Sequence, residues 1–331
     1  MEERLKAVCS GYYGFGNFGD EAVLSVLTEM FSKHYDLTVL SSNPENTSSL
    51  YNVKSLYSFD YVNVFNQIKE SDVLISGGGS LLQDVTSFKS LLYYLLLIYI
   101  AILYKKKIFI FAQGMGPFKS RVSEILVSKA LRQCSLITVR DDESYSLLKK
   151  WGIPSLKVVD PVYNLPIPKL TKKRCLGVQL RNFPTLTQDF LVKLAGVINQ
   201  EFVDYDVVLY SLQTAIDLDI CNKFSKMLNV KNVIVKSDMS ISETIDELSS
   251  LEYLIAMRFH SALIGLKAGV RVLPIVYDKK VRILAQEVGV KYLEFTDTDI
   301  QQKFIDLKTK YPLGVENILK DKKLDVEIFD I

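Results

Sequence analysis

Cationic side chains directly follow two apolar runs that have the composition of buried strands. Arg140 comes after SLITV, and Arg258 and His260 come after YLIAM. An arginine at the end of a strand can clamp a phosphate or carboxylate with its paired N–H groups. A histidine beside it can bind an anion or donate a proton. These residues predict a binding site for an anionic substrate. The alternative is that they share no ligand, so that each arginine is a solvated surface residue and the histidine is a neutral helix cap.

Two lysines add to this pattern. Lys279 and Lys280 follow the next apolar run, RVLPIVYD. Parallel strands end at one edge of a sheet, so we expect these lysines to lie on the same rim as His260. A compact group of cations suits a small ligand with phosphate and carboxylate groups, whereas a nucleotide also needs a pocket for its base and ribose. The other histidine, His34, is expected to face solvent at a helix end.

The stretch GYYGFGNFGDEAVL lies between an apolar run and a helical pattern. It matches neither GxGxxG nor GxxxxGK[ST], so the nucleotide-binding interpretation is weak. A tight turn with Asp20 as the N-cap of the helix would explain the end of this stretch without a ligand. The many small residues predict that the backbone at Gly14, Gly16 and Asn17 lies against a ligand. Either Asp20 or Glu21 could act as a general base on a hydroxyl group.

A second glycine-rich stretch, SGGGSLLQD, follows the run DVLI. We expect a helix to begin just after Gly77, Gly78 and Gly79, with Ser80 as its cap, so that backbone N–H groups cradle an anion or a sugar. A turn alone would need one glycine, which favours the ligand interpretation. The stretch AQGMGP is explained almost as well by a simple strand exit.

Short apolar runs alternate with helical patterns along most of the chain, which indicates an α/β fold with parallel sheets. The stretch DPVYNLPIPKLTKKR interrupts the alternation with three prolines and a basic cluster. We predict two Rossmann-like domains that face a cleft. Their expected ranges are 1–160 and 175–310, with a linker at 161–174 and a C-terminal tail at 311–331 that packs back as a helix.

Composition excludes several classes of protein. The net charge of +2 argues against nucleic-acid binding, and two histidines with four dispersed cysteines argue against a metal site. No signal-peptide pattern is visible at the N-terminus, so we expect a cytoplasmic protein. The run from Leu91 to Tyr104 has 14 apolar residues, whereas a spanning helix needs about 20. A helix buried in an α/β domain is expected there, with a membrane-contacting face as the alternative.

Taken together, the motifs resemble the polysaccharide pyruvyl transferase family, especially its bacterial cell-wall branch. The resemblance extends from residue 8 to about residue 285 and is carried by GYYGFGNFGDEAVL, SGGGSLLQD, AQGMGP, VRDDES, MRFHSALIGLKAGV and YDKKV. It implies a GT-B-like fold and transfer of pyruvate from phosphoenolpyruvate (PEP) to two hydroxyls of one sugar, as a cyclic ketal. The implied acceptor is an N-acetylmannosamine on a lipid-linked intermediate, whose polymer anchors surface-layer (S-layer) proteins.

The resemblance also implies a donor site. The family's arginine, histidine and lysine fall on Arg140, His260 and Lys280, and Arg258 lies beside them. Lys279 stands where the family often has proline, so the choice between the two lysines stays open.

The implied chemistry needs a base and an acid but neither a metal nor another cofactor, because PEP is itself the donor substrate. Asp20 is the candidate base, and His260 is the candidate acid or phosphate ligand. The expected partner is a lipid-linked glycan at the membrane surface, with peripheral attachment to its inner face and an oligomer as further expectations. The alternatives are a nucleotide-sugar-dependent GT-B glycosyltransferase and a non-catalytic sugar-binding protein.

Overall fold

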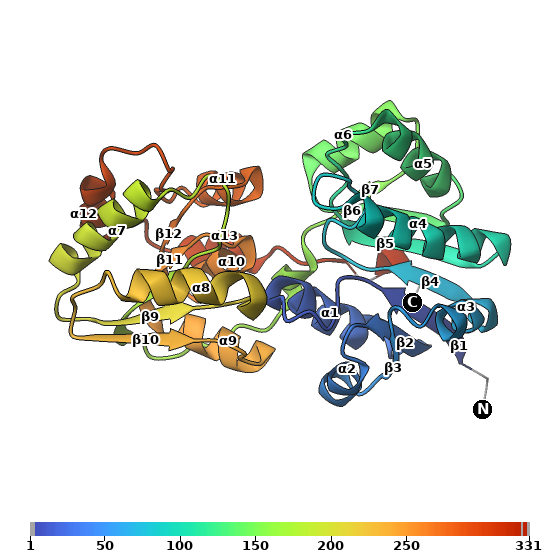
Figure 1. The fold of residues 1–331 in the computed structure, drawn as a ribbon, viewed down its shortest axis with the longest axis horizontal. Helices are drawn as coiled ribbons and strands as arrows, with labels where there is room; N and C mark the ends of the chain where they lie inside the picture. The colour runs from blue at the N-terminus through green and yellow to red at the C-terminus, as the bar shows by residue number, and fades with distance from the viewer. Residues whose placement is uncertain (1–3, 326, 330–331) are drawn as a thin grey trace. The chain divides into compact units, whose positions relative to one another are not determined.

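The computed structural model of the chain describes residues 4–325 and 327–329 and divides into two compact units (Figure 1). The first unit runs to Leu165 and also takes in the end of the chain from Lys323. The second unit runs from Pro166 to Lys322. The chain thus first passes from one unit to the other inside the predicted linker, at the proline-containing segment that ends the strand and helix alternation.

The first unit is built on a parallel sheet. Its order is β3-β2-β1-β4-β5-β6-β7 among the described residues, so the order reverses between β1 and β4. The strands are β1 Leu5–Ser10, β2 Tyr35–Ser41, β3 Lys54–Tyr57, β4 Val73–Ser76, β5 Lys107–Gln113, β6 Leu136–Val139 and β7 Leu156–Lys157. The helices are α1 Phe18–Phe31, α2 Pro44–Tyr51, α3 Tyr61–Glu70, α4 Phe88–Leu103, α5 Arg121–Leu131, α6 Asp142–Lys150 and the 3-10 helix η1 Pro161–Asn164.

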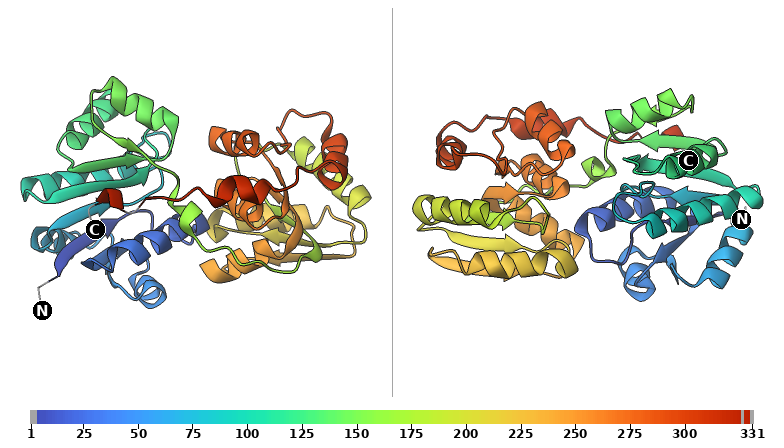
Figure 2. Two further views of the ribbon diagram at one scale, coloured as in Figure 1. Left: turned by 180° about the vertical axis from the view of Figure 1, so that it is seen from behind. Right: turned by 45° about the horizontal axis from the view of Figure 1, so that its top comes forward.

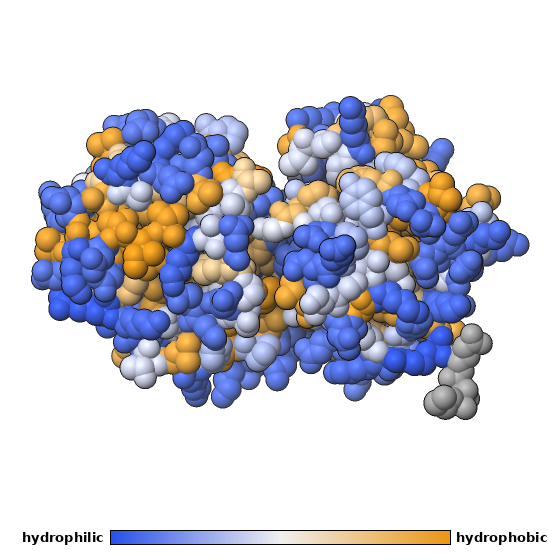
Figure 3. Space-filling view, turned by 60° about the horizontal axis from the view of Figure 1, so that its bottom comes forward, coloured by the Kyte–Doolittle hydropathy of each residue, from blue (hydrophilic) through white to orange (hydrophobic). Residues whose placement is uncertain are grey.

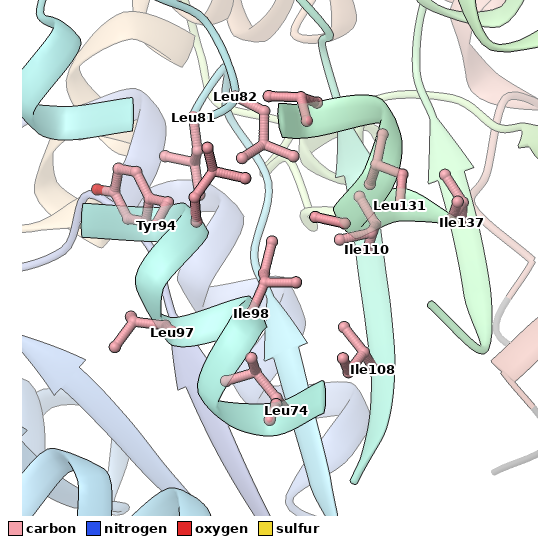
Figure 4. Close-up of a cluster of buried hydrophobic side chains, with 14 of the residues drawn as sticks. Leu74, Leu81, Leu82, Tyr94, Leu97, Ile98, Ile108, Ile110, Leu131 and Ile137 are labelled. Carbon is pink, nitrogen blue, oxygen red and sulfur yellow. The ribbon is translucent and has the colours of Figure 1, made fainter. Parts of the chain in front are cut away.

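Strand β5 is apolar on both faces because helices cover both sides of the sheet. Ile108 and Ile110 belong to the same buried cluster as the inner side of α4 (Figure 4). The alternate residues Phe109 and Phe111 contact Phe329 instead, with ring centroids 6.5 and 5.3 Å apart. Phe329 lies in the 3-10 helix η2, Glu327–Phe329, which returns to the first unit at the end of the chain (Figure 2). The C-terminus therefore completes the core of this unit.

Helix α4 contains the long apolar run, and only part of the burial prediction holds. Its inner side is buried and includes Tyr94, Leu97 and Ile98, of which Ile98 points toward β5 in Figure 4. Its outer side is exposed at Leu92, Leu96 and Leu103, so the expectation of a buried helix holds for the inner side alone. A helix lying on one face of a sheet has only one covered side, however apolar its sequence is. No helix among the described residues has the length and hydropathy needed to cross a bilayer.

The second unit repeats the design with a parallel sheet of order β10-β9-β8-β11-β12, which reverses between β8 and β11. Its strands are β8 Lys173–Gln179, β9 Asp206–Tyr210, β10 Asn232–Lys236, β11 Leu251–Ala256 and β12 Arg271–Pro274. Its helices are α7 Gln188–Glu201, α8 Thr214–Ser225, α9 Ile241–Ser249, α10 Phe259–Lys267, α11 Lys279–Glu287, α12 Ile300–Thr309 and α13 Val315–Lys320. The predicted α/β class with two Rossmann-like units is confirmed.

Candidate functional site

The two glycine-rich stretches meet at the point where the strand order of the first unit reverses. Strands β1 and β4 are neighbours, with Ser10 opposite Ser76, and each glycine-rich stretch starts directly after its strand. Open α/β sheets bind ligands at such a switch point, beyond the carboxyl ends of the strands. The fold therefore brings together two motifs that lie more than 50 residues apart in the sequence.

Packing accounts for two of the glycines that were predicted to line a ligand. A methyl group at Gly77 would overlap the hydroxyl of the buried Tyr13, and one at Gly78 would lie 2.6 Å from Cγ1 of Val23. Side chains of the first stretch thus fill the space that the glycines of the second leave open. Gly16 differs, because its φ is +66° and no atom lies within 4 Å of a methyl group added there. Gly16 stays a predicted ligand contact, and packing does not explain it.

The N-cap of α1 is Asn17, so the explanation with Asp20 as the cap of this helix is wrong. Asn17 has an extended backbone, and its Oδ1 accepts a hydrogen bond from the Gly19 amide. Asp20 lies in the first turn and accepts a hydrogen bond from Nδ2 of Asn17. A methyl group at Gly79 would lie 3.0 Å from Oδ1 of Asp20. The carboxylate therefore lies beside the second glycine-rich stretch.

The expected helix after the second stretch does not begin at Ser80. Residues 77–87 form an irregular loop, and α4 starts at Phe88 with Ser87 as its N-cap. The AQGMGP stretch holds this loop in place, because Nε2 of Gln113 donates to the Gly77 carbonyl at 2.7 Å. The amide of Gly114 donates to the carbonyl of Gly79 at 2.8 Å. These contacts satisfy the loop's polar backbone without a helix.

Glu21 holds the first glycine-rich stretch from inside. Its carboxylate accepts hydrogen bonds from the Gly14 amide at 2.7 Å and from the Tyr51 hydroxyl at 2.9 Å. Burial raises the pKa of Glu21, and these two hydrogen bonds lower it by a smaller amount. Glu21 therefore has a structural role in this stretch, and the choice between Asp20 and Glu21 as the base stays a prediction.

The raised pKa of Glu21 predicts a pH-dependent stability. A raised folded-state pKa stabilises the fold below the ordinary glutamate pKa, and this contribution is lost as the pH rises through the folded-state value. Glu21→Gln removes the titration, so we expect the variant to gain stability relative to wild type at about pH 8 but not at about pH 4. Urea unfolding midpoints at both pH values measure this. Glu29→Gln, on the exposed side of the same helix, is the control, and a gain equal at both pH values would contradict the assignment.

Arg140 lies at the exit of β6 in the first unit. Its guanidinium forms an ion pair with Asp160, and both side chains are almost fully buried. Asp160 also caps η1 by accepting a hydrogen bond from the Val162 amide at 3.0 Å. Nε of Arg140 is buried and has no hydrogen-bond partner among the described residues. Arg140 thus has a structural partner and one unused donor, and its place in the donor site stays a prediction.

Arg258 lies where the strand order of the second unit reverses, between β8 and β11. Its Nε donates to Oδ2 of Asp217, and one terminal nitrogen donates to Oδ1, both at 2.8 Å. That nitrogen also donates to Oε1 of Gln213 at 3.0 Å. Asp217 is fully buried. This bidentate ion pair neutralises the charge of Arg258. For the predicted contact with the donor substrate, the guanidinium would have to bind Asp217 and the donor at the same time.

His260 lies in the first turn of α10, next to this ion pair. The side chain of the N-cap residue, Arg258, makes no capping hydrogen bond. A helix N-terminus favours anions in general, so His260 lies at a position where a bound anion would be stabilised. The neighbouring strand β12 is also followed by cationic residues. Lys279 and Lys280 are the first two residues of α11, the helix after β12. Lys280 is half-buried and Lys279 is exposed, which favours Lys280 as the residue that faces a ligand.

Arg181 is a candidate that the sequence reasoning missed. It follows β8, and its amide donates to Sδ of Met257 at 3.3 Å, which places it beside the exit of β11. Its guanidinium lies 5.6 Å from the ring centroid of Tyr277, beyond β12. Its Nε is buried and has no hydrogen-bond partner among the described residues. The sequence does contain the pattern that would have identified Arg181, because this residue follows an apolar strand as Arg140 and Arg258 do.

Comparison with protein families finds one match. The family model described as polysaccharide pyruvyl transferase matches residues 17–279 of this chain. The match begins at Asn17, inside the first glycine-rich stretch, contains the second stretch and the exits of β6, β8 and β11, and ends at Lys279, the first residue of α11.

Solved structures with the same fold bind UDP or UDP-sugars. HepE of Anabaena, solved with UDP-glucose, superposes with a TM-score of 0.67 at 10% identity, over 99% of both chains. MnaA of S. aureus, solved with UDP, gives 0.65 at 12% identity over 98% of this chain and 94% of that one. The UDP-GlcNAc 2-epimerase of Neisseria meningitidis, bound to UDP-GlcNAc, gives 0.62 at 11% identity over 98% and 96%. At such low identity, these likenesses show the fold alone.

Proposed function

The chain belongs to the polysaccharide pyruvyl transferase family, and from this premise we propose that it moves pyruvate from PEP onto two hydroxyls of one sugar. The proposed acceptor is an N-acetylmannosamine of a lipid-linked cell-wall intermediate, and the product is a cyclic ketal that serves to anchor surface-layer proteins. We place the reaction on the cytoplasmic side of the membrane. The observation that supports the proposal best is the gathering of Arg181, His260 and Lys280 around the strand exits of the second unit.

The charges of PEP match this set of residues. PEP carries a phosphate and a carboxylate, and each needs cations or N–H donors when it leaves water. Lys280 and Arg181 can supply the cations, and the N-terminus of α10 can supply backbone N–H groups. We assign the phosphate to this region of the second unit. The family pattern adds Arg140 to the proposed donor residues.

The reaction needs two proton transfers before the ring closes. An acid, for which we propose His260, protonates the methylene carbon of PEP and leaves a cationic centre at C2. One sugar hydroxyl attacks C2 and loses its proton to a base, for which we propose Asp20. The bond from C2 to the bridging phosphate oxygen then breaks, and phosphate leaves with its electron pair. The second hydroxyl attacks C2, loses its proton to His260, which the first step left neutral, and closes the ketal.

The decisive experiment measures phosphate release from PEP by the purified full chain. A panel of lipid-linked and soluble glycosides serves as acceptors, and UDP-sugars are offered as competing donors. We expect phosphate release only when PEP and a suitable glycoside are both present, with a pyruvylated product detected by mass spectrometry. Consumption of a UDP-sugar without use of PEP would instead identify a glycosyltransferase. A shift in melting temperature with PEP but no turnover would identify a binding protein.

Asp20→Asn tests the proposed base. Asn17 caps α1, so we expect the variant to keep the melting temperature of the wild type. Because asparagine cannot take a proton from the sugar hydroxyl, we expect kcat to fall about 100-fold. Glu21→Gln is the matched variant one residue away and should retain most of its activity. Loss of turnover in Glu21→Gln with an active Asp20→Asn would reverse the assignment of the base.

A further inference from the structure

Helix α4 presents a continuous apolar stripe to solvent. Its members are spaced by three or four residues, which places them on one side of the helix. Between 37% and 72% of each side chain is exposed in the stripe residues Phe88, Leu92, Leu96, Tyr99 and Leu103. Isolated exposed apolar residues are ordinary, and the face in Figure 3 shows separate hydrophobic patches among hydrophilic residues. A row of five along one helix is a larger feature that needs a partner.

Among the described residues, no element of the unit covers the stripe. The opposite side of α4 packs on β4 and β5 (Figure 4), and α3 and α5 flank it. Tyr99 is tied to α5 through a hydrogen bond from its hydroxyl to the Leu126 carbonyl at 3.0 Å. The outer face of α5 continues the apolar surface with Val122 and Ile125, which are 61% and 45% exposed. The stripe on α4 and the exposed apolar residues of α5 thus form one surface.

The segment that carries this face is rich in basic residues. Residues 85–135 contain one acidic side chain, Glu124, which accepts a hydrogen bond from the Trp151 indole at 3.0 Å. The same segment contains eight basic residues, whereas the whole chain has a net charge of only +2. Four lysines of this segment are exposed and form no ion pair among the described residues. They are Lys89, Lys105, Lys107 and Lys129. Positive charge is therefore concentrated in the segment of the chain that carries the apolar stripe.

We propose that this face, the α4 stripe with its flanking lysines, docks on the surface of an anionic lipid bilayer. A bilayer offers acyl chains for Leu96 and Leu103 and lipid phosphates for the lysine ammonium groups. Lysine reaches the head groups on its flexible stem while its methylene groups lie along the apolar surface. A protein partner suits this surface less well, because lysine is depleted in protein interfaces. With 16 residues, α4 lies on the bilayer rather than across it.

This docking would serve the proposed function but does not depend on it. The stripe begins at Phe88, directly after the loop that carries Gly77, Gly78 and Gly79. A lipid-linked acceptor would therefore have its sugar close to the edge of the sheet where Asp20 lies.

Co-sedimentation of the full chain with vesicles tests the proposal. We expect binding to phosphatidylcholine vesicles that contain phosphatidylglycerol, little binding to pure phosphatidylcholine, and weaker binding at high salt. Leu96→Glu with Leu103→Glu, and separately Lys105→Glu with Lys107→Glu, should each lower the vesicle affinity at least about tenfold. These side chains are exposed, and unchanged circular dichroism and melting temperature confirm folding. Leu313→Glu, at a side chain that is 98% exposed in the second unit, is the matched control and should bind like wild type.

Three results would overturn the proposal. They are the absence of vesicle binding by wild type, equal binding by the stripe variants, and conversion of an oligomer to a monomer by Leu103→Glu without vesicle binding, which would identify a second copy as the partner. Phosphate release with a soluble glycoside separates this proposal from the proposed function. We expect the stripe variants to keep that activity, so failure to bind vesicles leaves the reaction untouched.

Discussion

Replacing His260 by alanine is expected to lower kcat/KM for PEP by about 10²–10⁴-fold while the protein stays folded. His260 is only partly buried and lies in the first turn of α10, so its removal leaves a small space at the edge of the unit and not a hole in the core. Its loss removes the proposed acid and one ligand of the phosphate. Steady-state phosphate release and a melting curve measure both consequences.

The control is provided by the sequence, which has only two histidines. His34 is exposed beyond the end of α1, and His34→Ala should retain wild-type rates. His260→Gln separates the two proposed roles, because glutamine can donate a hydrogen bond to phosphate but cannot supply a proton. We expect His260→Gln to keep KM near that of wild type and to lose kcat. Wild-type turnover in His260→Ala would remove this residue from the site.

The second large effect concerns stability. Arg258→Met is expected to lower the free energy of unfolding by about 3–5 kcal/mol, because it leaves the fully buried Asp217 charged and without its two guanidinium contacts. Replacing both partners, in Arg258→Met with Asp217→Leu, should recover most of that loss, since well-packed apolar residues can substitute for a buried ion pair. Urea unfolding of the wild type, both single variants and the double variant completes the cycle.

The same double variant tests whether Arg258 touches the donor. If it is as stable as wild type but has a raised KM for PEP, the predicted donor contact is supported. An unchanged KM would confine Arg258 to the ion pair. A double variant no more stable than Arg258→Met alone would contradict the argument from the buried charge. Lys193→Met with Asp189→Leu, an exposed pair on α7, is the control and should change stability little.

Part of the site could be predicted because strand exits have a local signature. An apolar run followed by an arginine or a glycine cluster marks the end of a buried strand, and this found Arg140, Arg258 and His260. The same signature occurs at Arg181, where it was overlooked. Capping is equally local, and the acidic start of α6 agrees with its cap, Asp141. The cap of α1 could not be chosen, because Asn17 and Asp20 both suit a cap and only the backbone conformation decides between them.

The sequence alone determined the α/β class, the alternation of strands and helices, and the family, because periodicity and motif order are recorded in neighbouring residues. Only the tertiary structure decided which strands lie side by side, and hence that both glycine-rich stretches meet at one switch point. It also decided that Arg258 is bound by Asp217, a residue 41 positions away. The exposed stripe of α4 also depends on the tertiary structure. The sequence of a helix that is apolar all round does not indicate which of its sides is exposed, because the neighbouring elements decide this. Long-range packing sets partners and burial, and no local pattern encodes either.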